Sequence, residues 1–409
     1  MADTRVDSPA AADQSSLDLL TGPGATDLLQ AAVATNGGRL LSWTAREVDH
    51  RPGASTTVSY RARVALPDGE RPITLGASTG LRTVRSDTPG MLVLSDGNQQ
   101  VAVWRFPSDP GLPGLARAFD ESTVRALLGS FGVQAGQLDL HLRAYRPRRR
   151  AVVEVTGPGV RLFVKVLRPT KVADLHRRHR LLYEAGVPVP RSLGWTDDGL
   201  LVLSALPGND LRDALRDGAR GAPDPDEILA MLDRFPATVS DLPPRPSWTD
   251  NVQHYATILG STLPHEAERA SGLAKHVVQG LAASAPAHSD PTHGDLYETQ
   301  ILLEGGRITG LLDVDTAGPG RRADDLACLV AHAALLAHIE PEHAATTTEL
   351  TARMVAAFDR RVDPAELRLR VAGVLMSLAT GPHRVQEPGW AAATSARLDL
   401  VQRWLDVSP

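Results

Sequence analysis

The chain of 409 residues has a single cysteine, Cys328, and few aromatic residues, only 4% of the total. One cysteine excludes a disulfide framework within the chain, which suits a reducing compartment. No apolar run approaches the ~18 residues that a membrane span needs, and the first residues contain no apolar segment of a signal peptide. We therefore expect a cytoplasmic protein without membrane contacts, in which Cys328 is an inert core residue.

The chain also lacks an excess of positive charge. Its 43 basic and 48 acidic residues give a net charge of −5, so the total charge indicates no affinity for nucleic acids. The content of 42% hydrophobic and 22% charged residues is ordinary for a globular protein. The length is enough for two or three domains with a large core, and the composition leaves the oligomeric state open.

Strand-like patterns dominate the first half of the chain and helix-like patterns the second half. Residues 1–20, rich in Ala, Asp and Ser, predict a disordered tail. Predicted strands lie at 40–48, 56–65, 72–77, 91–94, 100–106, 138–145, 151–156, 161–167 and 200–205, with helices at 121–131 and 171–185. Predicted helices follow at 211–216, 225–235, 250–259, 266–283, 324–337, 346–361, 364–379 and 391–405. This order predicts an α+β architecture with a β-rich part and a helical part.

The most informative stretch is 293–313. Asp295 follows a His-Gly pair, Gln300 comes five residues later, and Asp313 ends a short apolar run. A predicted hairpin over 301–312 brings the three together. Phosphoryl transfer needs one carboxylate beside the acceptor hydroxyl, a second one for Mg²⁺ on the nucleotide phosphates, and a neutral oxygen ligand. We predict that Asp295 is catalytic and that Gln300 and Asp313 hold Mg²⁺, with ATP as the donor.

Three further polar residues belong to this region. His293 is either a general base or a structural residue that holds the loop, and we favour the structural role because Asp295 is better placed as the base. Asp325, at the start of a helix, either caps that helix or ties down the catalytic loop. Asp315 would share a face with Asp313 if the strand continued. It is then a metal or substrate ligand, or else a turn residue.

Lys165 lies within the apolar strand 161–167. A charge in such a strand is costly to bury unless it is paired. We predict that Lys165 grips the α- and β-phosphates, as the strand lysine of protein kinases does; the alternative is an edge lysine that faces solvent. Its candidate acidic partner is Asp174 in the next helix, which can equally be a first-turn charge that complements the helix dipole.

A Pro/Gly break between two helices near the C-terminus carries His383, Arg384 and Trp390. These side chains can wall a substrate site. Trp390 is, in the alternative, a packing residue.

These motifs resemble the aminoglycoside phosphotransferase family of kinase-like enzymes. The resemblance lies in His293-Gly294-Asp295, in the amide five residues later, in the apolar strand that ends at Asp313, and in Asp325-Leu-Ala. It covers roughly residues 138–405. It implies a bilobal protein-kinase-like fold, with a β-rich small lobe and a helical large lobe. It also implies a hinge at which backbone groups of Ser204, Ala205 and Leu206 bind adenine.

Gln300 stands where resistance enzymes of this family usually have Asn. In this respect the chain is similar to bacterial maltokinases and actinobacterial glucosamine kinases, which carry an extra N-terminal cap domain. The resemblance then implies a cap domain over 21–135, a kinase N-lobe over 136–205 and a C-lobe over 206–409.

One internal similarity leaves two explanations open. The turn at 50–53, His-Arg-Pro-Gly, and the strand after it resemble the turn at 145–148, Tyr-Arg-Pro-Arg, and its strand. Either the first is a degenerate copy of the small lobe, without a lysine like Lys165, or two hairpins share turn chemistry. The arginines at 148–150 either contact phosphates or form a solvated hairpin tip, which is the more common case.

We predict an ATP-dependent kinase that phosphorylates a hydroxyl group of a sugar or amino sugar. One alternative is an aminoglycoside or macrolide antibiotic kinase. The other is a pseudokinase that binds nucleotide without turnover.

Overall fold

The computed structural model describes residues 16–80, 90–95, 100–218, 221–282 and 289–407. The chain divides into two compact units. The first unit comprises Met1–Val172, Gly194–Val202 and Pro382–Trp390, and the second comprises Ala173–Leu193, Leu203–Gly381 and Ala391–Pro409. Two large sheets belong mainly to the first unit and most helices to the second, so the predicted α+β class is confirmed.

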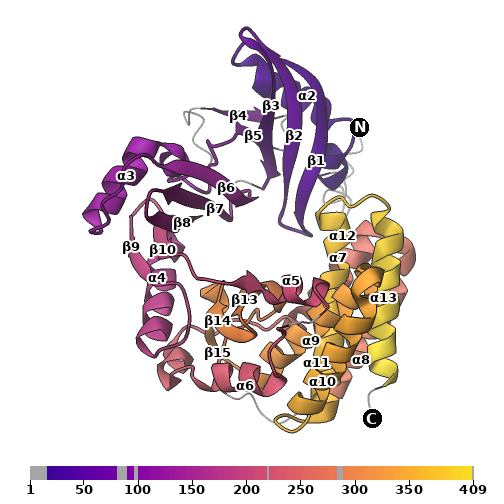
Figure 1. Ribbon diagram of the computed structural model, residues 1–409. Helices are drawn as coiled ribbons and strands as arrows, with labels where there is room; N and C mark the ends of the chain where they lie inside the picture. The colour runs from indigo at the N-terminus through magenta and orange to yellow at the C-terminus, as the bar shows by residue number, and fades with distance from the viewer. Residues whose placement is uncertain (1–15, 81–89, 96–99, 219–220, 283–288, 408–409) are drawn as a thin grey trace. The chain divides into compact units, whose positions relative to one another are not determined.

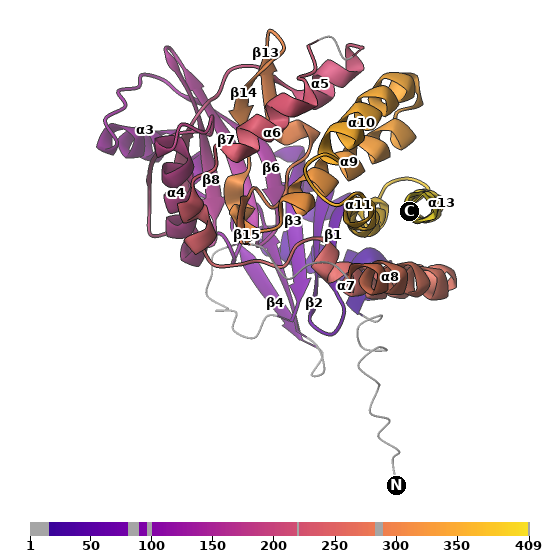
Figure 2. The ribbon, with the colours of Figure 1, turned by 90° about the horizontal axis from the view of Figure 1, so that it is seen from below.

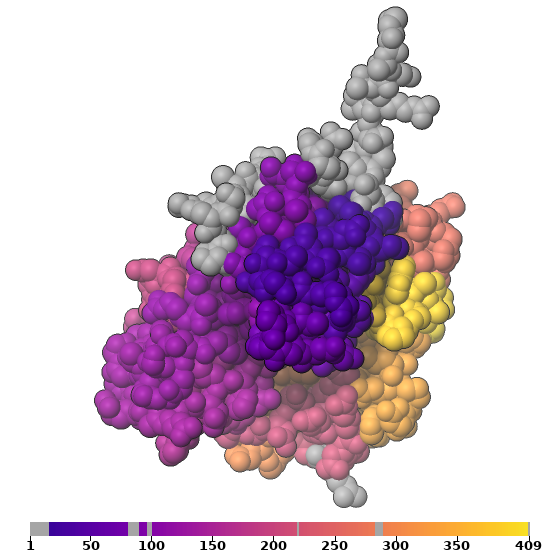
Figure 3. All heavy atoms as spheres, turned by 90° about the horizontal axis from the view of Figure 1, so that it is seen from above, coloured from indigo at the N-terminus to yellow at the C-terminus, as the bar shows by residue number. Residues whose placement is uncertain are grey.

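The first sheet has five antiparallel strands in the order β1-β2-β3-β5-β4. They are β1 (Arg39–Arg51), β2 (Ser55–Leu66), β3 (Gly69–Thr79), β4 (Met91–Ser95) and β5 (Gln100–Arg105). Alternate apolar residues such as Val58, Tyr60 and Ala62 form a core with helix α2 (Ala25–Ala34) on one face of the sheet (Figure 1). Seen from above, this part of the unit presents one block of indigo atoms (Figure 3).

Leu17 and Leu20 are buried in the same core. The packed chain therefore starts before residue 21, because these two side chains have an apolar surface to cover. Residues 1–15 of the predicted tail lie outside the described ranges.

The second sheet repeats this order, as β6-β7-β8-β10-β9. Its strands are β6 (Asp139–Arg146), β7 (Arg150–Gly157), β8 (Val160–Leu167), β9 (Ser192–Trp195) and β10 (Leu200–Ser204). Helix α3 (Glu121–Ser130) precedes it as α2 precedes the first sheet. The Asp120 side chain caps α3 by accepting from the Thr123 N–H.

The first turn of each sheet has the same geometry. Gly53 and Arg148 occupy the same position in the two turns, and both have a left-handed backbone, with φ of 74° and 60°. Both turns close on residue pairs four apart, Arg51 with Ser55 and Arg146 with Arg150. The shared strand order and turn favour a duplicated unit over a coincidence of turn residues.

The strand registers also identify the counterpart of Lys165. Lys165 of β8 pairs with Val152, two residues into β7. Ser78 of β3 pairs with Thr57, two residues into β2. Ser78 therefore holds, in the first sheet, the place that Lys165 has in the second.

The second unit is mainly helical. Its helices, two of which start in the first unit, are α4 (Pro169–Glu184), α5 (Leu211–Arg216), α6 (Pro225–Asp233), α7 (Val252–Thr262), α8 (Ala267–Leu281), α9 (Arg322–Ile339), α10 (Ala344–Phe358), α11 (Pro364–Ala379) and α13 (Trp390–Asp406). Helix α9 is buried on most sides and packs on α10 and α11, while α7 and α8 lie against α11 (Figure 2). Across the described ranges, no helix combines the length and the apolar character that crossing a membrane requires.

Two small sheets hold the stretch 293–313. The first contains β11 (Asn209–Asp210), β13 (Ile301–Glu304) and β14 (Arg307–Leu311), and the second contains β12 (Asp290–Thr292) and β15 (Gly318–Gly320). The hairpin β13–β14 agrees with the sequence pattern, and Gly305 and Gly306 at its tip both have a positive φ. The pairing of β12 with β15 was not expected. It closes the loop that lies between them.

Candidate active site

Buried hydrogen bonds hold the loop that carries Asp295. The His293 ring is fully buried; its Nε2 lies 2.8 Å from the Leu312 carbonyl oxygen, and its Nδ1 accepts from the Asp295 N–H at 3.3 Å. This pattern requires the neutral ring with its proton on Nε2. His293 therefore connects the loop to the end of β14.

Asp325 ties the same loop from the other side. Its carboxylate accepts from the N–H of His293 at 2.8 Å and from the N–H of Gly294 at 2.7 Å. Helix α9 begins at Arg322, so Asp325 lies in the first turn and does not cap the helix. Burial raises the pKa of Asp325. Gly294 has φ of 81°, and a Cβ there would lie 2.8 Å from the Thr316 carbonyl oxygen, so only glycine fits.

Asp295 is partly exposed, and the side chains of Trp248 and Cys328 both face its carboxylate. The Trp248 indole Nε1–H donates to Asp295 Oδ1 at 3.2 Å. The Cys328 sulfur lies 4.0 Å from the same oxygen. Burial and the Asp295 charge raise the pKa of the Cys328 thiol, so this sulfur stays protonated and faces the carboxylate as a weak donor.

Gln300 and Asp313 lie on adjacent strand ends. The Leu312 N–H donates to the Gln300 carbonyl oxygen at 2.8 Å, which brings the residue before Asp313 against Gln300. The Gln300 side chain is 6% exposed, and it makes no side-chain hydrogen bond to another described residue. An amide and a carboxylate are hard oxygen donors of the kind that Mg²⁺ prefers, so the residues present fit this ion.

Asp313 has a left-handed backbone, with φ of 55° and ψ of 46°. This conformation costs a non-glycine residue about 1–3 kcal/mol and is concentrated at functional sites. β14 ends at Leu311, and a 3-10 turn over Val314–Thr316 follows. The idea that Asp315 shares a strand face with Asp313 is therefore wrong, because the strand does not continue.

Asp315 lies instead near a buried arginine of α4. Arg178 is 3% exposed and donates its Nε–H to the Ala317 carbonyl oxygen at 2.9 Å. Burial lowers the pKa of Arg178, and the Asp315 charge acts in the opposite direction. Arg178 thus holds the turn that follows Asp313.

The nucleotide-binding residues predicted from the sequence are distributed over both units. Lys165 of the first unit is 6% exposed in the middle of β8. Asp174 of the second unit lies 3.2 Å from Arg177 of the same helix, as an exposed ion pair. In the predicted hinge, the Ser204 N–H donates to the Arg191 carbonyl oxygen at 2.9 Å, so this amide is already used. Ala205 and Leu206 follow it directly.

The C-terminal candidates belong to the first unit. The rings of His383 and Trp390 pack edge to face, with centroids 4.8 Å apart, and burial lowers the pKa of His383 to about 4. Arg384 lines a small pocket together with Glu47 and Arg149. The role of His383, Arg384 and Trp390 in binding an acceptor stays a prediction.

A pocket of about 550 Å³ lies beside the catalytic loop, within the second unit. Gly294 of the loop and Trp248, the donor to Asp295, are both part of its wall. Tyr255 lies next to Trp248, with ring centroids 6.4 Å apart. The other polar lining residues include Arg245, Asp250, Asn251, Arg321 and Asp324.

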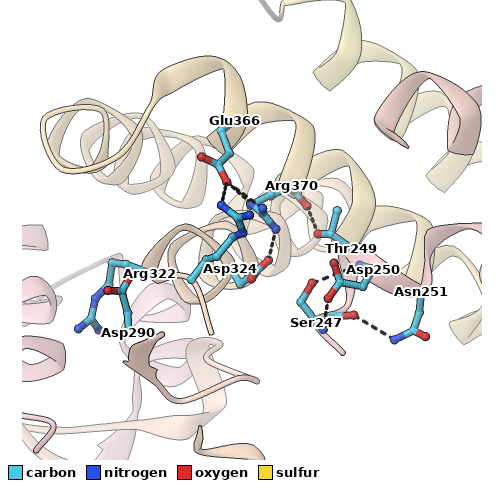
Figure 4. Close-up of polar contacts among 10 residues, drawn as sticks. Ser247, Thr249, Asp250, Asn251, Asp290, Arg322, Asp324, Glu366 and Arg370 are labelled. Atoms are coloured by element: carbon cyan, nitrogen blue, oxygen red, sulfur yellow. Dashed lines mark hydrogen bonds and ion pairs between the residues drawn. The ribbon is translucent and has the colours of Figure 1, made fainter. Parts of the chain in front are cut away.

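The acids of this pocket already have partners. The Asp324 carboxylate accepts from Arg370 Nη1 at 2.7 Å, and Arg370 also pairs with Glu366 (Figure 4). Burial raises the pKa of Asp324 to about 6. Asp250 accepts from the Ser247 N–H at 2.8 Å. Two aspartates and two arginines line the pocket, so its charge is balanced.

Glu298 and His332 form a titratable pair next to the loop. Burial raises the pKa of Glu298 to about 7 and lowers the pKa of His332 to about 3. The His332 Nδ1 and Glu298 Oε2 atoms are 3.6 Å apart, and Tyr297 stacks on the His332 ring. Both members of the pair are therefore neutral between those two values.

Sequence reasoning missed Trp248, Tyr255 and Arg178. Trp248 follows a Pro-rich segment, and a tryptophan at such a position just before a helix was the available signal. Arg178 lies in an arginine-rich helix, where nothing in the sequence distinguishes it from its exposed neighbours.

The profile of the phosphotransferase enzyme family (APH) matches residues 141–370, more than half of the chain. A choline/ethanolamine kinase family protein from Mesorhizobium loti is similar in fold, with a TM-score of 0.51, 16% identity, and coverage of 71% of this chain and 94% of that chain. A macrolide 2′-phosphotransferase from Brachybacterium faecium has a TM-score of 0.43 and 19% identity, over 68% of this chain and 98% of that chain. Aminoglycoside phosphotransferase APH(4)-Ia has a TM-score of 0.47 and 16% identity, over 69% of this chain and 98% of that chain. No curated protein matches this sequence.

The chain belongs to the phosphotransferase enzyme family. It is an ATP-dependent phosphotransferase that acts on a hydroxyl group of a small molecule.

Proposed function

We propose that the acceptor is a sugar or an amino sugar, as for enzymes of the maltokinase and glucosamine kinase type. The observation that carries this proposal is the pocket of about 550 Å³ beside Asp295. Its volume lies in the range of small-molecule sites. Trp248 and Tyr255 offer aromatic faces to the C–H side of a pyranose ring, and the Asp, Asn and Arg side chains around them offer partners for hydroxyl groups.

The charge of this pocket supports a sugar acceptor over a polycationic one. A polycationic aminoglycoside needs a surplus of carboxylates. Here Asp250 and Asp324 are balanced by Arg245 and Arg321, and Asp324 already pairs with Arg370. A neutral sugar, or a sugar with one amine, matches this balance better. Gln300 in the catalytic motif points to the same enzyme type.

In this proposal, Asp295 accepts the proton of the acceptor hydroxyl while its oxygen attacks the γ-phosphorus of ATP and the bond to the ADP oxygen breaks. The Trp248 indole N–H orients the Asp295 carboxylate. Lys165 contacts the nucleotide phosphates. Adenine is bound by backbone groups of Ala205 and Leu206, because the Ser204 N–H is already bonded.

Mg²⁺ supplies charge neutralisation at the phosphates when it is bound. Gln300 and Asp313 would hold it, through an amide oxygen and a carboxylate. The left-handed backbone of Asp313 and the bond from Leu312 to Gln300 keep both donors in place.

The test is an ATP-consumption screen across neutral sugars, amino sugars, aminoglycosides and macrolides, with and without a Mg²⁺ chelator. We expect turnover with a sugar or amino sugar and none after chelation. Turnover confined to an antibiotic would assign the pocket to a resistance kinase. Absence of turnover on every acceptor would overturn the proposal.

Replacing Asp295 by Asn tests the assigned base. We expect kcat to fall by about 10²–10⁴-fold, the usual contribution of general base catalysis, while ATP binding is retained. Calorimetric titration with ATP and steady-state kinetics separate the two effects. Asp290→Asn, on β12 of the same unit, is the matched control and should keep most of the turnover.

A further inference from the structure

The first unit contains a second concave site, on the sheet that carries no predicted catalytic residue. A pocket of about 710 Å³ is lined by strands of the first sheet together with Phe106, Leu142 and Tyr145. Three arginines line it, Arg46, Arg61 and Arg105, and the lining contains no acid. We propose that this pocket binds a small organic molecule that carries a phosphate group.

The positive charge of the pocket is not neutralised by the chain itself. Within the described ranges, none of Arg46, Arg61 and Arg105 makes a side-chain ion pair or a side-chain hydrogen bond. Other arginines of this sheet do so: Arg63, two residues after Arg61, lies 3.1 Å from Glu70. Arg61 lies on the same face of β2 as Ser59, and its guanidinium group fits a phosphate dianion, which accepts forked hydrogen bonds.

The pocket is separate from the face that carries Lys165. Lys165 pairs with Val152, whereas Leu142 pairs with Val153 and Tyr145 with Ala151. Because successive side chains of a strand point to opposite faces, Leu142 and Tyr145 lie on the face of the second sheet away from Lys165. A ligand in this pocket therefore occupies a different place from the nucleotide phosphates.

On the first sheet, however, the pocket lies on the face that corresponds to the Lys165 face of the second sheet. Ser78 is the counterpart of Lys165, and its partner Thr57 lies on the same face as Ser59 and Arg61 along β2. Ser59 and Arg61 line the pocket. The duplicated sheet thus keeps a polar, phosphate-compatible face, with Arg61 in place of the lysine; this comparison rests on the proposed role of Lys165.

The pocket walls indicate an organic body on the ligand. Phe106 packs edge to face on Tyr145, with centroids 5.1 Å apart. The Tyr145 hydroxyl accepts from Trp104 Nε1 at 3.0 Å and donates to Asp109 Oδ2 at 2.8 Å, so its ring is fixed. Ile73 adds apolar surface. Inorganic phosphate alone would leave these walls uncovered.

The experiment is calorimetric titration of the full chain with glucose 6-phosphate, inorganic phosphate and glucose, for wild type, Arg61→Ala and Arg63→Ala. Arg63→Ala removes the same charge from the same strand, outside the pocket. We expect saturable binding of glucose 6-phosphate that weakens at least tenfold in Arg61→Ala and is unchanged in Arg63→Ala. It should also weaken as salt is raised. Arg46→Ala is the second pocket variant.

Tighter binding of glucose 6-phosphate than of inorganic phosphate supports a phosphorylated organic ligand, and equal binding of the two supports free phosphate as the occupant of the same site. No saturable binding, or an equal loss in Arg61→Ala and Arg63→Ala, overturns the proposal. Binding that Arg61→Ala leaves intact places the ligand elsewhere and also overturns it. Turnover with ATP, measured on the same variants, should be unchanged. Its absence in wild type bears on the proposed function and not on this pocket.

Discussion

The two five-stranded sheets have the same strand order and the same left-handed turn, but they carry different chemistry. Lys165 in the second sheet corresponds to Ser78 in the first. Ser78 is fully buried and shares a 2.8 Å hydrogen bond with Thr57. The comparison teaches that the topology survives when the buried lysine of one sheet is replaced by a small residue that packs.

The first sheet also supports the turn of the second. Arg148 Nη1 donates to Ser78 Oγ at 2.8 Å, and Arg149 Nε lies 2.9 Å from Asp49. Arg146 Nε lies 3.4 Å from Glu47. Carboxylates and a hydroxyl group of the first sheet therefore hold these arginines, of which Arg149 stays exposed.

Asp109 is the central anchor of the contact between the first sheet and the turn at 146–149. It is 4% exposed and accepts from the Arg148 N–H at 2.7 Å, from the Gly111 N–H at 2.7 Å and from Tyr145. A Cβ at Gly111 would lie 2.7 Å from Arg148 Cα, so glycine permits the close approach. Burial raises the pKa of Asp109.

The sharpest test of the comparison is to remove the residue that distinguishes the sheets. We expect Lys165→Ala to lower kcat/KM for ATP by about 10²–10³-fold, the usual effect of removing one preorganised donor. Ser78→Ala should leave kcat/KM within a few-fold. Lys171→Ala, at an exposed position on α4, controls for loss of a lysine. Equal kinetic losses at positions 165 and 78 would contradict the comparison.

Asp109→Asn breaks the contact between the sheets. An amide cannot accept all three hydrogen bonds, and leaving buried donors without a partner costs about 1–3 kcal/mol of unfolding free energy. Chemical denaturation measures this loss, with Asp68→Asn at an exposed turn as the control. A further rise in KM for ATP would show that the turn positions the nucleotide; full stability would refute the role of Asp109.

Asp109 is a buried carboxylate with several hydrogen bonds. Glu298, in the second unit, is a buried carboxylate whose Oε2 has no hydrogen-bond partner in the described ranges, and Glu298→Gln tests this difference. Burial raises the folded-state pKa of Glu298 from 4.5 to about 7. The protonated side chain therefore contributes stability that is present below pH 4.5 and lost as pH rises through 7. We expect the variant to gain about 1–3 kcal/mol over wild type at pH 8 and little at pH 4.5. Denaturation at both pH values checks this, and Glu342→Gln, at an exposed site, should show no such difference.

The smallest effects concern the shared turn. Gly53→Ala should lose about 1 kcal/mol, because its φ of 74° is left-handed. Arg148→Gly should be close to neutral, since relief of the same backbone strain offsets the lost bond to Ser78. Thermal unfolding of both variants gives the result. A large loss in Arg148→Gly would mean that the guanidinium contact outweighs the strain.

The local motif of the site was predictable from sequence, and its surroundings were not. Gln300 and Asp313 flank one short hairpin, so local spacing alone predicts that they lie at neighbouring strand ends. Trp248 reaches Asp295 across 47 residues, and Asp109 reaches Arg148 across 39. Such contacts depend on tertiary packing, which no local pattern records.

The α+β class and most strands followed from periodicity and turn residues in the same way. The failure at Asp315 has a local cause: β14 ends at Leu311, one residue before the end of the predicted hairpin, and the left-handed backbone of Asp313 leads into a 3-10 turn.

The anchored turn at 146–149 has a consequence for binding entropy. A turn with several polar anchors has few conformations to lose, so ordering it around a ligand requires little further loss of conformational freedom. A flexible glycine-rich loop would lose more at each binding event. The first sheet, although it lacks the lysine, thus keeps the neighbouring turn ordered without any ligand.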